Sequence, residues 1–192
     1  MLAVALSCAA CDTAPPSVAP PRSRSIDADD IAVMRGVLDS LHRPHLLVVD
    51  TTLAHCPVHP PRTNLTPRAD CLSPEWLGYV SRLFPSETSL TGLLAFDERN
   101  RDRLPVTGLL GSDTTFISAT VIDFLSRADL VARYPPGSAV VTFSAPLYPA
   151  PGVAVIAYGL HQTRDVVAGA RLERHTDSRW RVTANSQNGT IE

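Results

Sequence analysis

The sequence predicts a single α+β domain over residues 26–192, in which three or four helices pack on one face of a mostly antiparallel sheet. Two observations favour this fold class. Apolar residues recur at helical spacing through the first two thirds of the chain, and the period changes to two in the last third. The hydrophobic content of 44% is typical of a globular protein. A domain of this length can therefore bury a core without disulfides or metals.

The first helix is predicted from Asp27 to His42, with Ser25 or Asp27 as its N-cap and Pro44 ending it. The continuous apolar run Leu46–Val49 is too short for a helix and indicates a strand buried on both faces. Further helical patterns are predicted over residues 73–85, 86–100 and 120–134, with a short strand over 115–118.

The last third predicts a four-stranded antiparallel meander, because apolar and polar residues alternate and turn-forming residues separate the runs. Trp180 alternates with Arg179 and Arg181, which places its ring on the buried face. The alternative is a strongly curved sheet closed by helices into a cone, as in nuclear-transport-factor-like domains, and a cavity beneath the sheet would distinguish it. The predicted strands are Ala139–Ala145, Val153–Gly159, Val167–Arg174 and Arg179–Ala184.

The N-terminus predicts export. Residues 1–11 form an apolar run that ends in small residues and a cysteine, which is typical of a bacterial lipoprotein signal. Residues 12–25 are rich in proline and serine and predict an extended, solvated tether. We therefore expect a protein of the bacterial cell envelope, anchored to a membrane by lipid, with its domain outside the cytoplasm. The alternatives are a soluble secreted protein and a cytosolic one.

Cys11 is the predicted site of lipidation, because Ala9 and Ala10 before it are the small pair that a lipoprotein signal peptidase accepts. Cys8 is the alternative. The apolar run is shorter than a complete signal and no basic residue precedes it, so we expect the true start to lie upstream of Met1.

Several short motifs together resemble a diffuse group of uncharacterised bacterial envelope proteins. They are Val48–Thr52, Phe96 with Asn100, the Tyr134–Gly137 turn before a strand, and the paired segments 170–174 and 179–182. The resemblance covers residues 46–184 and implies an envelope protein. It implies no activity and no site residues, since none is known for the group.

Two cysteines bracket a proline-rich loop, and two histidines lie near them. A disulfide between Cys56 and Cys71 is the predicted pairing, because an exported chain meets an oxidising compartment. A zinc site formed by these cysteines with His55 and His59 is the second possibility, and free thiols are the third possibility. No cofactor and no metal are predicted.

Ser144, His161 and Asp165 are the residues that a hydrolytic triad would need, but no nucleophile-elbow motif surrounds the serine. The net charge of −2 and the absence of a basic cluster argue against a nucleic-acid surface. The leading hypothesis is therefore a non-catalytic envelope protein that binds an unknown protein partner or has a structural role. The alternative is a small-molecule-binding or hydrolytic protein with a pocket under the sheet.

Overall fold

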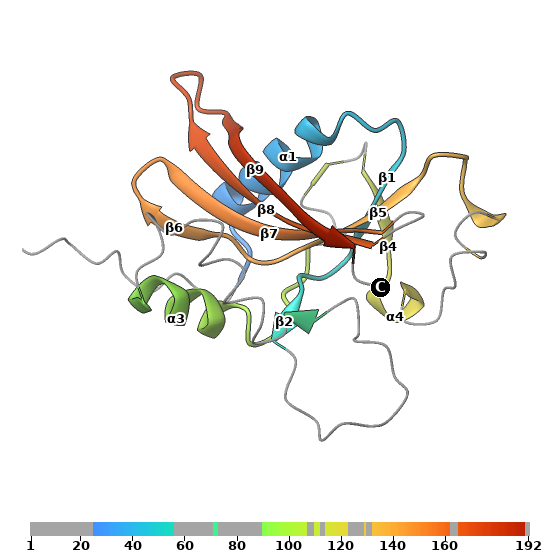
Figure 1. The fold of residues 1–192 in the computed structure, drawn as a ribbon, viewed down its shortest axis with the longest axis horizontal. Coiled ribbons are helices and arrows are strands. Elements are labelled where there is room, and N and C mark those ends of the chain that lie inside the picture. Colours follow the sequence, from blue (N-terminus) through green and yellow to red (C-terminus); the bar gives the residue numbers. More distant parts are fainter. Residues whose placement is uncertain are drawn as a thin grey trace, which may run out of the picture.

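A computed structural model describes residues 25–55, 71–72, 90–106, 110–111, 114–122, 129, 132–161 and 165–190. Its centre is a mixed sheet of seven strands in the order β4-β1-β5-β7-β8-β9, with β6 also pairing with β7 (Figure 1). The strands are β1 (Leu46–Val49), β4 (Thr115–Ile117), β5 (Ala139–Phe143), β6 (Leu147–Ala150), β7 (Val153–His161), β8 (Asp165–Arg174) and β9 (Trp180–Thr190).

The predicted fold class is wrong in two respects. β1 pairs in parallel with both β4 and β5, so the sheet is mixed, with two parallel and four antiparallel strand pairings among the described residues. The described residues contain three helices, α1 (Ala28–Leu41), α3 (Leu90–Arg99) and α4 (Ala119–Ile122), and α1 is the one that packs across several strands. The apolar pattern of Leu46–Val49 shows that β1 is buried, but it carries no information about the direction of the neighbouring strands.

The first helix lies where the sequence predicts it, because its ends are encoded locally. The side chain of Asp27 accepts from the backbone N–H of Asp30, and the side chain of Asp30 accepts from the N–H of Asp27, which makes a capping box. His42 ends the helix in the left-handed conformation (φ 50°), so that Pro44 can follow outside it.

α1 covers the face of the sheet formed by β7, β8 and β9 (Figure 1). Its buried face carries Val33, Met34 and Val37, each with an exposed fraction of 0%. The helix approaches β9 very closely at Gly36, where an added Cβ would lie 2.6 Å from the carbonyl oxygen of Trp180. A glycine at this position is therefore what allows the helix to sit on the strand.

The main core fills the space between α1 and the sheet. Side chains at alternate positions of each strand point into it, so Trp180 is buried, as the alternation predicts, with its ring edge-on to Tyr148 at 5.9 Å. A smaller cluster lies on the opposite face of the sheet. Small residues at Ala154, Ala168 and Ala170 pack in the main core, so in this region they serve close helix packing.

The four strands of the last third form β5, β7, β8 and β9, and each neighbouring pair among them is antiparallel. The sequence does not reveal β6, because Pro149 marks it as a turn, yet β6 pairs with β7 through a register shift that tolerates the proline. Of the predicted helices, the one over residues 73–85 lies outside the described residues, the next is described from Leu90 to Arg99, and the last from Ala119 to Ile122.

A second, small sheet consists of β2 (Ala54–His55) and β3 (Cys71–Leu72), which pair in parallel. Residues 56–70, between them, lie outside the described residues, as do the predicted signal and tether up to residue 24. Within the described part, no helix is long and apolar enough to cross a membrane.

Candidate functional site

An open groove of about 540 Å³ lies beside the C-terminal half of α1. Arg35, Leu38, Asp39 and His42 line one wall, since their spacing of three and four residues places them on one side of the helix. Opposite them lies β1, whose side chains at alternate positions face the same way. The remaining lining residues are Arg43, Pro44, Leu46, Val48 and Thr114.

The groove has an apolar floor and a charged rim. Leu38 and Val48 are buried, whereas Asp39, His42 and Arg43 are exposed. Two arginines oppose one aspartate, so the rim carries a net positive charge whether or not His42 is protonated. The volume of the groove lies within the range of ligand sites, about 300–1,000 Å³, although its lining is more polar than that of most such sites.

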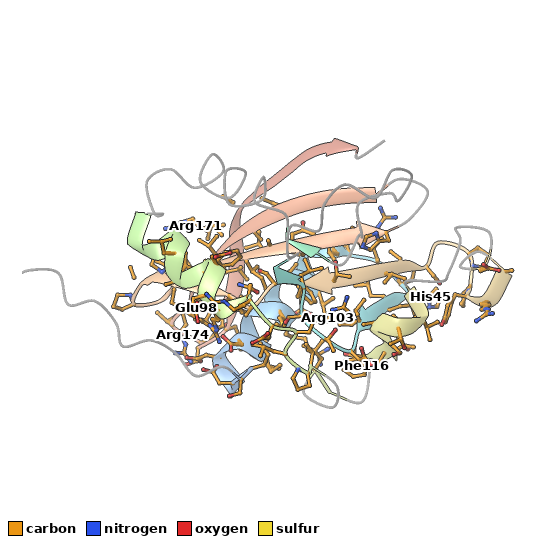
Figure 2. All side chains as sticks on the ribbon, turned by 90° about the horizontal axis from the view of Figure 1, so that it is seen from below. His45, Glu98, Arg103, Phe116, Arg171 and Arg174 are labelled. Atoms are coloured by element: carbon orange, nitrogen blue, oxygen red, sulfur yellow. The ribbon has the colours of Figure 1, made fainter. Side chains whose placement is uncertain are left out.

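The chain forms this groove because α1 turns back sharply into β1. The left-handed His42 reverses the backbone, and Arg43 and Pro44 connect the helix to the strand. The carbonyl of His45 accepts from the backbone N–H of Ala139 at 3.1 Å, which fixes the turn to β5. Figure 2 shows His45 and Phe116 on the opposite side of the molecule from Arg171 and Arg174, so the turn that follows α1 lies away from the β8–β9 hairpin.

A buried polar cluster lies at the other end of α1. Asp30 is 0% exposed and forms an ion pair with Arg99, the last residue of α3. The hydroxyl of Tyr148 donates to Asp30 Oδ1 at 2.8 Å, and Arg99 Nη1 donates to the carbonyl of Pro146 at 2.7 Å. Because its carboxylate is enclosed by these donors, the cluster is suited to joining α1, α3 and β6, and offers no open surface for a ligand.

Asn100 adds to the same junction. Its side-chain oxygen accepts from the backbone N–H of Ala145 at 2.7 Å, and its amide donates to the carbonyls of Phe96 and Ala145. The Asn100 side chain therefore makes the hydrogen bonds to the backbone of Ala145, in the connection between β5 and β6, that a neighbouring strand would otherwise make. Its burial and complete hydrogen bonding indicate a structural role.

The three residues of the hypothetical triad are not brought together. Ser144 is fully buried, and its hydroxyl accepts from the backbone N–H of Ala157 at 2.9 Å. Ala157 precedes His161 by four residues on β7, which is about 13 Å along an extended strand. The ring of His161 lies instead near Gly159 and Thr142, and Asp165 is opposite His161 in the register of β7 and β8. Ser144 therefore cannot serve as a nucleophile activated by His161.

The cysteine and histidine predictions lie largely outside the described residues. Cys56, His59 and Cys11 are not described, while His55 and Cys71 lie on the paired strands β2 and β3. Ala54 is the register partner of Cys71, so the two ends of the loop over residues 56–70 are side by side. No group of three metal-ligating side chains occurs among the residues whose positions are given. The disulfide and the lipidation remain predictions.

The sequence analysis predicted neither the groove nor the Asp30 cluster. The residues of the groove come from a helix, a strand and a separate segment at Thr114, so no local sequence motif joins them. A partial signal exists in α1, where Arg35, Asp39 and His42 follow each other at i, i+4 and i+7 beside the apolar face.

Comparison with known proteins found no matching family model, no matching curated protein and no matching solved structure.

Proposed function

We propose that the chain is a lipid-anchored protein of the bacterial cell envelope with a non-catalytic binding role, and that the groove beside α1 receives the partner. The observation that carries the binding role is the combination of an apolar floor with an exposed, net positive rim in a groove of about 540 Å³. The anchoring half of the proposal rests on the sequence pattern at Cys11 and the tether over residues 12–25.

The groove is supported by rigid elements, which favours binding over passive surface character. Val48 belongs to the main core with Val37 and Leu38, so the floor cannot move without disturbing the packing of α1. The rim residues after the helix are held by the hydrogen bond from Ala139 to His45. A site of this kind is preformed and loses little conformational entropy when a partner binds.

The net charge of the rim predicts an acidic partner surface. Arg35 and Arg43 present two guanidinium groups, which recognise carboxylates in a planar, bidentate geometry. The carboxylate of Asp39 offsets part of this positive charge, and it would favour a partner that also carries a hydrogen-bond donor. We therefore expect an envelope component with an acidic group beside an apolar one.

Site-specific photocrosslinking in the bacterium that makes the protein tests this proposal. A photoreactive amino acid replaces Asp39 in the groove or, in a matched protein, Arg101 in the turn after α3, which is also exposed. We expect one discrete adduct from position 39 and none of the same mass from position 101. Identical adducts from both positions, or no adduct from position 39, would contradict a binding role for the groove.

A charge reversal provides the second arm of the test. Arg43→Glu should abolish the adduct from position 39, because it converts the rim to a net negative charge. Arg179→Glu, at an exposed position of the β8–β9 hairpin that does not line the groove, is the matched control and should leave the adduct unchanged. Equal loss in both variants would indicate a general charge effect and not recognition at the groove.

A further inference from the structure

The two margins of the large sheet differ greatly. β4 ends the sheet on one side with three residues, whereas β9 ends it on the other with eleven. β9 pairs with β8 along its whole length, from Trp180 to Thr190, and among the described residues no strand lies on its outer side (Figure 1). Every second residue of this strand therefore directs its backbone N–H and C=O away from the sheet.

β9 protects its edge only near its ends. Proteins usually shorten an edge strand, or place a charge, a proline or a β-bulge in it. From Val182 to Thr190 the strand has no charged residue and no proline, and Arg181 is the one charge within its bounds. Register shifts occur near each end, but the pairing from Arg171–Ala184 to Val167–Asn188 is regular. The middle of the edge is thus regular and uncharged, and no strand of the described part of the chain covers it.

We propose that β9 pairs in antiparallel orientation with β9 of a second copy of this chain, joining the two sheets into one across a twofold axis. A twofold contact uses the same surface on both molecules, and antiparallel pairing lets each edge satisfy the outward groups of the other. The charge pattern suits this occupant. When the axis passes near Asn185 and Ser186, Arg181 lies opposite the uncharged far end of the partner strand, so like charges do not meet.

This contact is separate from the groove. Gly36 of α1 faces the backbone of Trp180 at the start of β9, whereas the groove lies along a different side of the helix, formed by Arg35, Leu38, Asp39 and His42. Dimerisation through β9 therefore leaves the groove accessible in both copies. Failure of the photocrosslinking at position 39 would not affect the dimer, and a monomeric protein would not affect the groove.

The mass of the full chain in solution, measured by analytical ultracentrifugation over a range of concentrations, is the first test. We expect a reversible monomer–dimer equilibrium. Single cysteines introduced at positions 184 to 188, in a chain whose native cysteines are replaced by serine, should form an intermolecular disulfide at one or two neighbouring positions near the axis. A monomer at all concentrations, or cross-linking that is equal at all five positions, would overturn the proposal.

A pair of adjacent proline variants identifies the edge. Ser186→Pro and Gln187→Pro remove neighbouring N–H groups, which point to opposite sides of the strand. The variant that loses the outward N–H should keep its thermal stability and become monomeric at concentrations where the wild type is dimeric. The other variant should be destabilised, because it loses a bond to β8. A dimer that persists in the stable proline variant would place the interface elsewhere, and the cysteine series decides the question if neither variant folds.

Discussion

Asp30 and Arg99 form the charge pair whose loss would be felt most strongly. The carboxylate of Asp30 is 0% exposed and the side chain of Arg99 is 9% exposed, so neither charge is well solvated. Buried pairs of this kind cost free energy to desolvate, and their net contribution is small while both partners are present. Removing one partner lowers the stability strongly, because the remaining charge stays buried without its counterion.

A double-mutant cycle tests this interpretation. Asp30→Leu should lower the free energy of unfolding by about 3–5 kcal/mol, because Arg99 is left uncompensated. The double variant Asp30→Leu/Arg99→Met removes both charges and should be more stable than the single Asp30 variant. Urea denaturation measures all members of the cycle. Additive losses in the double variant would show that the two side chains act independently.

A second prediction at the scale of one residue concerns Gly36→Ala. The expected change in stability is opposite in sign to the change that helix propensity alone predicts. Gly→Ala in a helix interior usually stabilises by about 1 kcal/mol. Here the new Cβ would lie 2.6 Å from the backbone oxygen of Trp180, so α1 must move away from β9. We expect Gly36→Ala to destabilise by about 1–3 kcal/mol, as overpacking does. Thermal melts decide it, with Asp39→Ala on the exposed side of α1 as control, and a stabilised Gly36→Ala would disprove the close contact.

At the scale of elements, the sequence predicts what is encoded locally and misses what depends on partners. α1 was predictable because its N-cap and its stop at Pro44 lie within its own sequence. The strand β8 was predictable from alternation, whereas β7 is an uninterrupted apolar run that is buried from Ala154 to Leu160. The direction of β1 was not, because a strand buried on both faces has the same apolar pattern in a parallel or an antiparallel neighbourhood. The extension of β9 to Thr190 was missed because its polar residues hide the period of two.

The β8–β9 hairpin provides a prediction about pH. The backbone N–H of Arg179 donates to the carboxylate of Asp177, and Arg181 donates to it as well, which holds the pKa of Asp177 below its usual range. A carboxyl with a depressed folded pKa stabilises the fold above the pKa of the unfolded chain, about 3.9, and the stabilisation is lost as pH falls through the folded pKa. The ordered hairpin turn should therefore loosen in that acidic window.

An NMR titration of the Asp177 carboxyl carbon measures this pKa directly. The same carbon in the urea-unfolded chain is the reference, and we expect the folded midpoint to lie at lower pH. Amide exchange of Ser178 and Arg179 should accelerate below that midpoint, and Asp177→Asn should remove the pH dependence. A folded midpoint equal to or above the unfolded one would contradict the role assigned to the two donors.

At the scale of the whole molecule, three distinctive regions lie around α1 and the sheet. The groove lies at the turn from α1 into β1, the Asp30 cluster lies at the start of α1, and the open edge is β9. The groove could not be predicted from the sequence, because its walls come from segments as distant as Arg35 and Thr114. The N-terminal signal pattern, by contrast, can be recognised from the sequence alone, because it depends on consecutive residues and on no tertiary contact.

The anchoring prediction follows from that local pattern. We expect Cys11 to carry lipid and to become the first residue of the mature protein, because small residues precede it and a proline-rich tether follows. A single acyl chain binds a membrane only marginally, so stable anchoring needs at least the two chains of a diacylglycerol group. The mature protein should therefore fractionate with membranes and remain there at high salt, which releases proteins that are held by charge alone.

Metabolic labelling with a fatty-acid analogue tests the anchor in a chain supplied with a complete upstream signal. The wild type should incorporate label, and Cys11→Ala should lose both the label and the membrane association. Cys8→Ala is the matched control and should retain both, because Leu6 and Ser7 before it fit the peptidase less well than Ala9 and Ala10 before Cys11. Label that survives Cys11→Ala and disappears with Cys8→Ala would move the site to Cys8. An unlabelled wild type would disprove the lipid anchor, while leaving the groove and the β9 contact to be judged by their own experiments.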